Sequence, residues 1–132
     1  MIIYSSPAIE LSLSGEPSRF NLTWKPECRF SSEPDLQREF EMILTFMNDH
    51  STKHILSDSL HYPFHGNLEM QNWLDFDFFP RLSNSGVRGF AVVAPPEAVE
   101  SYRSEKGGLF TEPQQEYFTD HDEANQWLDS LD

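Results

Sequence analysis

Phe90-Ala91-Val92-Val93-Ala94 is the longest apolar run in this chain of 132 residues. A strand with one face in water alternates apolar and polar residues, whereas a continuous apolar run is typical of a strand buried on both faces, as in parallel sheets. Pro95-Pro96 follows the run directly, and Pro96 suits the first turn of a helix. The stretch therefore predicts a buried parallel strand that leads into a helix, as in α/β folds.

Three further strand patterns open the chain. The stretches Ile2–Tyr4, Ile9–Ser14 and Phe20–Lys25 are short and rich in apolar residues. In the second and third, apolar residues alternate with polar ones, which is typical of a half-buried strand. Gly15-Glu16-Pro17-Ser18 between them has the composition of a turn. We therefore expect an antiparallel pair with one face in water.

A first helix is expected from Ser32 to about His50, followed by a short strand at His54–Leu56. Ser32 is suited to the N-cap, and Asp35 occupies the capping-box position three residues later. The apolar residues of this helix recur with the spacing of a single buried stripe. They are Leu36, Phe40, Ile43, Leu44 and Met47.

A second helix is expected after the loop that contains Pro63 and Gly66. Asn67 can cap this helix, and Gly86 is a natural C-terminal stop. Pro80 lies inside the pattern and should kink the helix or end its first half. The apolar residues of the pattern are Leu68, Met70, Trp73, Leu74, Phe78 and Leu82.

The C-terminal third predicts one more strand and two more helices. The helix that starts at Pro96 should turn Val99 and Tyr102 inward and end at Gly107-Gly108. A strand is expected next at Glu116–Phe118. It is followed by a final helix that Asp120 and Glu123 cap. The order is βββαβαβαβα, an α/β (α+β) fold in which helices pack on a mixed sheet. The length fits a single domain, residues 1–132. The final helix carries Ala124, Trp127, Leu128 and Leu131.

Charge excludes several kinds of partner. The chain has 22 Asp and Glu residues against 9 Lys and Arg, a net charge of -13, which argues against binding nucleic acid or anionic lipid. After Lys106 the chain has seven acidic residues and no Lys or Arg. This segment could dock a basic partner or could form a solvated acidic tail. The acids are Glu112, Glu116, Asp120, Asp122, Glu123, Asp129 and Asp132.

The compartment is expected to be the cytoplasm. Cys28 is the one cysteine, so no intrachain disulfide can form, which suits a reducing environment. The first residues lack the basic start and the apolar stretch of a signal peptide. No apolar run approaches the roughly 20 residues that span a bilayer, so we expect no membrane insertion.

A set of motifs between residues 73 and 128 matches the pattern of a known family. The set comprises Trp73, Phe79-Pro80-Arg81, Gly86–Val93, Tyr117–Asp120, Glu123-Ala124 and Trp127-Leu128. It resembles the small bacterial STAS-like proteins, which are similar to the anti-sigma-factor antagonist and sulphate-transporter domain superfamily. The resemblance extends over most of the chain. It implies a STAS-like sheet, but a fold can host many functions.

The resemblance also places a possible regulatory position. In the anti-sigma-factor antagonists, a phosphorylatable Ser preceded by Asp opens a helix, and the added charge switches partner binding. Asp58 matches the strand-end Asp of that family. The second helix starts as His65-Gly66-Asn67-Leu68, without Ser or Thr, and Ser57 and Ser59 lie on the wrong side of the loop. This departure argues against a phosphorylation switch.

Few residues suggest catalysis or metal binding. Asp58, His61 and His65 could ligate a metal, but Pro63 and Gly66 interrupt the helix that would align them, so a polar loop is favoured. Asp120-His121-Asp122 is more simply a charged helix start. Cys28 has no neighbouring residue that would activate a thiolate. Gly107-Gly108 lacks the following Lys and Ser or Thr of a phosphate-binding loop. We expect neither metal nor cofactor.

Four aromatic residues fall within seven consecutive positions of the second helix: Trp73, Phe76, Phe78 and Phe79. They cannot share one narrow face, so a second side must be buried against something. The cover could be a partner protein or second subunit. It could be a small apolar ligand, in a pocket lined by Trp73, Phe76 and Phe79. It could also be the chain's own core, if Pro80 turns some rings inward. Arg81 is expected to pair with Asp77.

These patterns predict a non-enzymatic protein that acts through regulatory protein–protein contacts. We expect a homodimer and favour a partner with a basic surface. Trp73, Phe76, Phe78, Phe79 and Arg81 are the candidate contact residues. The alternative is a carrier of a small apolar ligand or lipid, bound beside the second helix.

Overall fold

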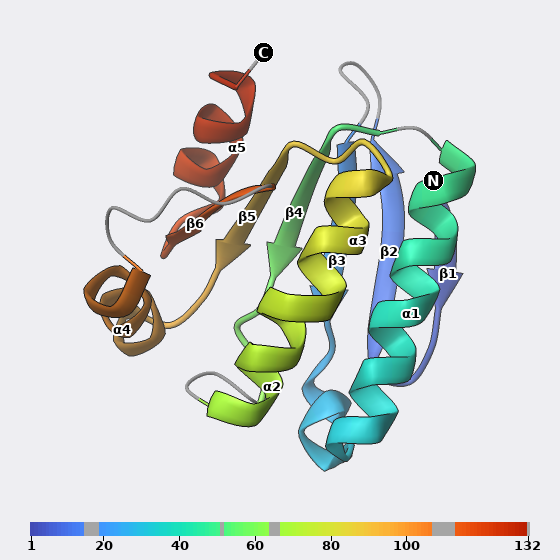
Figure 1. Ribbon diagram of the computed structural model, residues 1–132, viewed down its shortest axis with the longest axis horizontal. Coiled ribbons are helices and arrows are strands. Elements are labelled where there is room, and N and C mark those ends of the chain that lie inside the picture. Colours follow the sequence, from blue (N-terminus) through green and yellow to red (C-terminus); the bar gives the residue numbers. More distant parts are fainter. Residues whose placement is uncertain (15–18, 51, 64–66, 107–112, 132) are drawn as a thin grey trace.

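The computed structural model describes residues 1–14, 19–50, 52–63, 67–106 and 113–131. Within this part of the chain, one mixed six-stranded sheet holds its strands in chain order (Figure 1). Neighbours from β1 to β3 are antiparallel and those from β3 to β6 are parallel, as the buried run at Phe90–Ala94 predicts. The strands are β1 (Ile2–Ser5), β2 (Ile9–Ser14), β3 (Arg19–Trp24), β4 (His54–Asp58), β5 (Gly89–Val93) and β6 (Gln114–Phe118).

Helices connect the parallel strands. The prediction of an α/β fold with helices packed on a mixed sheet is confirmed. The turn at 15–18 and the helix end at Gly107-Gly108 fall outside the described residues. The helices are the 3-10 helix η1 (Pro26–Phe30), α1 (Glu33–His50), α2 (Leu68–Trp73), the π-helical turn η2 (Leu74–Phe78), α3 (Phe79–Asn84), α4 (Pro96–Lys106) and α5 (His121–Asp129).

Local sequence signals define where the helices begin. Ser32 N donates to Asp35 Oδ2 (3.1 Å), and Asp35 N donates to Ser32 Oγ (3.3 Å), which is the predicted capping box. Asn67 Oδ1 accepts from Met70 N (2.9 Å) at the start of α2. Asp120 Oδ1 accepts from Asp122 N (3.0 Å) at the start of α5. The predicted N-cap residues Ser32, Asn67 and Asp120 are therefore confirmed.

The strands alternate between two apolar cores, one on each face of the sheet. Phe90 and Val92 of β5 point to the larger core, where α1, α2, α3 and α4 pack. Ala91 and Val93 point to the smaller core under α5. Parallel connections that advance in one direction with one handedness place their helices on the same face, which explains this distribution. The smaller core consists of Leu56, Ala91, Val93, Phe118, Ala124 and Leu128.

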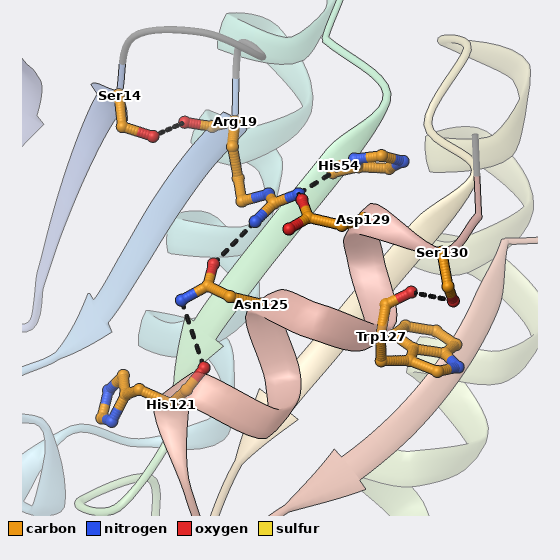
Figure 2. A network of polar contacts seen from close by, with 8 residues as sticks. All are labelled: Ser14, Arg19, His54, His121, Asn125, Trp127, Asp129 and Ser130. Atoms are coloured by element: carbon orange, nitrogen blue, oxygen red, sulfur yellow. Dashed lines mark hydrogen bonds and ion pairs between the residues drawn. The ribbon is translucent and has the colours of Figure 1, made fainter.

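A buried arginine fixes α5 against the sheet (Figure 2). Arg19 is 6% exposed; its Nη1 donates to Asn125 Oδ1 and its Nη2 donates to Asp129 Oδ1, both at 2.7 Å. Asp129 lies in the last turn of α5, where the helix dipole favours a nearby cation. His54 Nδ1 lies 3.5 Å from Arg19 Nη2 on the neighbouring strand. Arg19 therefore links β3 to the middle of α5 through Asn125 and to its last turn through Asp129.

A glycine allows the same helix to approach β5. A Cβ added to Gly89 would lie 2.5 Å from Leu131 Cδ1 and 3.0 Å from Leu128 Cδ2. A contact of 2.5 Å is essentially never made by a real Cβ atom, so a side chain at position 89 must displace the end of the Leu131 side chain. The absence of a side chain at Gly89 thus allows the C-terminal leucines to pack closely against β5.

We predict that Gly89→Val lowers the free energy of unfolding by about 1–3 kcal/mol, because the added atoms overpack the smaller core. Chemical denaturation measures the change. Gly89→Val combined with Leu131→Ala should be more stable than the sum of the two single effects predicts, because the shorter side chain makes room. A Gly89→Val variant as stable as the original protein would contradict this packing.

Candidate functional site

The second helix passes through Pro80 by changing its hydrogen-bond pattern. Phe79 N donates to Leu74 O, the i to i+5 bond of a π-turn, and α3 continues from there with Pro80 in its first turn. Pro80 has no N–H, and its ring would clash with the carbonyl four residues earlier in a regular α-helix. A π-turn is one way in which a helix accommodates such a residue. The regular α-helix therefore ends at Trp73, before the predicted position at Pro80.

The π-turn separates the four aromatic rings. Phe78 is fully buried and lies 4.7 Å from the ring of Phe40, and Phe79 is 6% exposed and lies 5.2 Å from the ring of Phe90. Both rings belong to the larger core. Trp73 is half-buried against that core, whereas Phe76 is 83% exposed. Of the predicted contact residues, Phe78 and Phe79 are thus enclosed by the chain's own core, and Phe76 protrudes from it.

Phe76 is part of an exposed row along the helix. Leu68, Asn72, Phe76 and Pro80 follow one another at intervals of four residues, and all four are exposed. We call this row the outer ridge. Leu68 is 73% exposed, so the ridge carries two large apolar side chains. The sequence pattern groups Leu68 with the inward residues of the helix, but Leu68 is exposed. The interval of eight residues between Leu68 and Phe76 is the sequence signal that places both on the same side of the helix.

Arg81 joins the second helix to α1. Its Nη1 donates to Glu41 Oε2 at 2.9 Å, and its Nε lies 3.1 Å from Asp77 Oδ1, the predicted i, i+4 partner. The hydrogen bond from Arg81 lowers the pKa of Glu41 below its ordinary value. All three side chains are partly exposed, so the pair stabilises the fold only modestly. Arg81 therefore connects the helix that carries the outer ridge to α1.

A small cavity lies between the second helix and the sheet. Its walls include Trp24, Phe40, Tyr62, Leu74 and Phe79, and its volume is about 30 Å³. That volume suits a water molecule, whereas pockets for drug-sized ligands hold roughly 300–1,000 Å³. The ligand alternative drawn from the sequence places Trp73, Phe76 and Phe79 in the wall of a pocket, and of these Phe79 lines the cavity.

Hydroxyl groups form one part of the cavity wall. Trp24 Nε1 donates to Ser57 Oγ at 3.2 Å, and the hydroxyls of Ser57 and Ser59 are 2.8 Å apart. Both serines are almost completely buried. Burial raises the pKa of the Tyr62 phenol above its ordinary value. These groups are therefore neutral and enclosed, which makes Ser57 and Ser59 poor targets for modification in the folded chain.

Asp58 lies where the parallel strand β4 ends. Its Oδ2 is 3.1 Å from His121 Nε2 at the start of α5, and its Oδ1 accepts from Leu60 N at 3.3 Å. His61 is exposed, and its carbonyl accepts from Cys28 Sγ at 3.1 Å. His65 falls outside the described residues. Within those residues no group of three or more His, Cys, Asp or Glu side chains is placed to hold a metal ion.

Comparison of the chain with protein-family models, with curated proteins and with solved structures finds no match. The resemblance to STAS-like proteins therefore stays a prediction. Among the described residues, no helix has the length and apolar composition needed to cross a bilayer. The outer ridge is the candidate functional site because one helix there presents two large exposed apolar side chains, Leu68 and Phe76, in a single row.

We predict that Cys28 resists alkylation in the folded protein. The residue is fully buried, and burial raises the pKa of its thiol to about 11. Iodoacetamide at pH 8 should label it about a hundredfold more slowly than in the denatured chain, because the thiolate is the reactive form. The pKa of the Cys28 thiol is higher in the folded chain than in the unfolded chain. The thiol's contribution to the free energy of unfolding should therefore be complete below pH 9 and should decline as the pH rises toward 11. Equal labelling rates would contradict the placement.

Proposed function

We propose that this protein is a non-enzymatic regulator that acts by binding another protein through the outer ridge. The observation that carries the proposal is Phe76, which is 83% exposed on a helix whose neighbouring rings are buried. A large apolar side chain exposed together with Leu68 is a feature of interaction surfaces. Aromatic residues of this kind contribute most of the binding energy in many interfaces.

The condition of the reactive groups supports a binding role. Cys28 is buried with a raised pKa, and Ser57 and Ser59 bond to each other inside the core. His121 is engaged by Asp58. A nucleophile needs both access to substrate and an activating base. Cys28, Ser57 and Ser59 are buried and therefore lack access to substrate.

The regulatory part of the proposal comes from the resemblance to STAS-like proteins, and its cytoplasmic setting comes from the single cysteine. Both are inferences from sequence. The ridge is consistent with such a role because it lies on the helix that the resemblance covers, from Trp73 to Arg81. A fold-level likeness does not identify a partner.

The carrier alternative has less support. It requires an apolar pocket beside the second helix, and the cavity found there is about 30 Å³. To admit a lipid chain, the helix would have to move away from β5 and expose Phe78 and Phe79. Such a movement would cost the burial of two aromatic rings, about 1.5–3 kcal/mol each.

We predict that Phe76→Glu abolishes capture of the partner from a lysate of the source organism, with the tagged protein as bait and quantitative mass spectrometry as readout. Phe30→Glu is the matched control, because Phe30 is 78% exposed but lies on η1. Partners specific to the ridge should be retained by Phe30→Glu and lost with Phe76→Glu.

Both variants should fold, because an exposed substitution usually changes stability by no more than about 0.5 kcal/mol. Thermal unfolding checks this before capture. If Phe76→Glu folds normally and still retains every protein that the original chain captures, the ridge is not the binding surface and the proposed function fails.

A further inference from the structure

We infer that the occupant of the outer ridge is a basic amphipathic helix of a partner protein and not a second copy of this chain. The inference rests on the proposed function and adds the chemistry of the partner. It comes from two observations: the spacing of the apolar side chains on the ridge and the sign of the charges around it.

The apolar side chains match a helical partner. Leu68 and Phe76 are eight residues apart on one continuous helix, which corresponds to about 12 Å along its axis. An amphipathic helix presents its own apolar residues at spacings of three, four and seven. A helix packed along the ridge can therefore contact both Leu68 and Phe76, the geometry of amphipathic-helix recognition.

Among the side chains that the structure describes beside the ridge, acidic groups outnumber basic ones. On the ridge helix, Glu69 is exposed and Asp75 and Asp77 flank Phe76. The ridge helix stands between α1 and α4 in Figure 1. On the α1 side, the charge of Arg81 is matched by Glu41 and Asp77. On the α4 side, Glu97 and Glu100 are exposed.

The fold explains why acids collect at one end of this surface. Each helix that follows a parallel strand begins at the carboxyl end of the sheet, and helix dipoles favour acidic residues at helix starts. The first turns of α1, α2 and α4, the helices on this face, accordingly carry acidic residues at that end. Lys53 and Arg88 precede the parallel strands β4 and β5 and lie at the opposite end, whereas Lys25 and Arg29 follow β3 and offset only part of the acidic charge at this end. The resulting field attracts a cationic segment to the start of the ridge.

A second copy fits this surface poorly. In a symmetric dimer the same patch meets itself, so the acidic surroundings of Phe76 on one copy would be brought close to those on the other. Like charges brought together across an interface oppose binding, whereas Lys and Arg of a partner would complement them. Charge complementarity therefore favours a basic helix over self-association through the ridge.

The test uses synthetic helical peptides labelled with fluorescein and the full chain, with anisotropy as the readout. The first peptide has a Leu face and a Lys face. The second has the same composition in scrambled order, and the third replaces Lys by Glu. The first should bind at least about tenfold more tightly than either of the others. Its affinity should fall as salt rises from about 0.05 to 0.5 M.

Variants assign the binding to the ridge. Phe76→Ser should weaken the Leu–Lys peptide about tenfold, and the control Phe30→Ser should leave it unchanged. Glu69→Gln should weaken it about two- to fivefold, because Glu69 contributes charge and little contact. Equal binding of the scrambled peptide with no effect of Phe76→Ser would mean that net charge alone attracts the probe, and would overturn the inference.

Light scattering distinguishes the remaining outcome. In place of the homodimer expected from the sequence, the inference expects a monomer at low micromolar concentration. A dimer that Phe76→Ser dissociates would identify the second copy as the occupant and overturn the inference, while leaving a protein contact at the ridge intact. The proposed function itself fails if capture from a lysate does not depend on Phe76.

Discussion

The missing N–H of Pro80 is the constraint on which this surface depends. A regular helix cannot continue through that residue, and the chain responds with a π-turn closed by the bond from Phe79 N to Leu74 O. Around this turn the adjacent residues Phe78 and Phe79 both reach the core, while Phe76 faces outward. One side of the turn thus belongs to the larger core, and the other side carries part of the exposed apolar row that we propose as the binding surface.

The sequence was most informative where the signal is local. The apolar run at Phe90–Ala94 identifies the buried parallel strand, and side-chain caps such as Ser32 mark helix starts within a few residues. The π-turn could not be predicted, because periodicity analysis assumes about 100° for every residue of a helix. The role of Gly89 was equally hidden, because the leucines that would clash with a side chain there are distant in sequence. Tertiary packing, and not local pattern, determines both features.

The distribution of charge follows from the topology. Parallel strands with helical connections direct every helix start to one end of the sheet, and acidic residues are favoured there. Part of the C-terminal acidity has internal roles: Asp129 pairs with the buried Arg19, and Asp120 caps α5. The prediction of a basic partner at the C-terminal face therefore shifts toward the ridge, where Phe76 adds apolar contact to the negative charge.

The contrast between Phe76 and Phe78 tests the central claim most directly, and the free energy of unfolding is the quantity to measure. Phe78→Ala should lower it by about 3–5 kcal/mol, because a fully buried ring is replaced by a cavity. Phe76→Ala should change it by no more than about 0.5 kcal/mol, because its side chain already lies in water. If Phe76→Ala were as destabilising as Phe78→Ala, Phe76 would belong to the core, and the outer ridge would not be a binding surface.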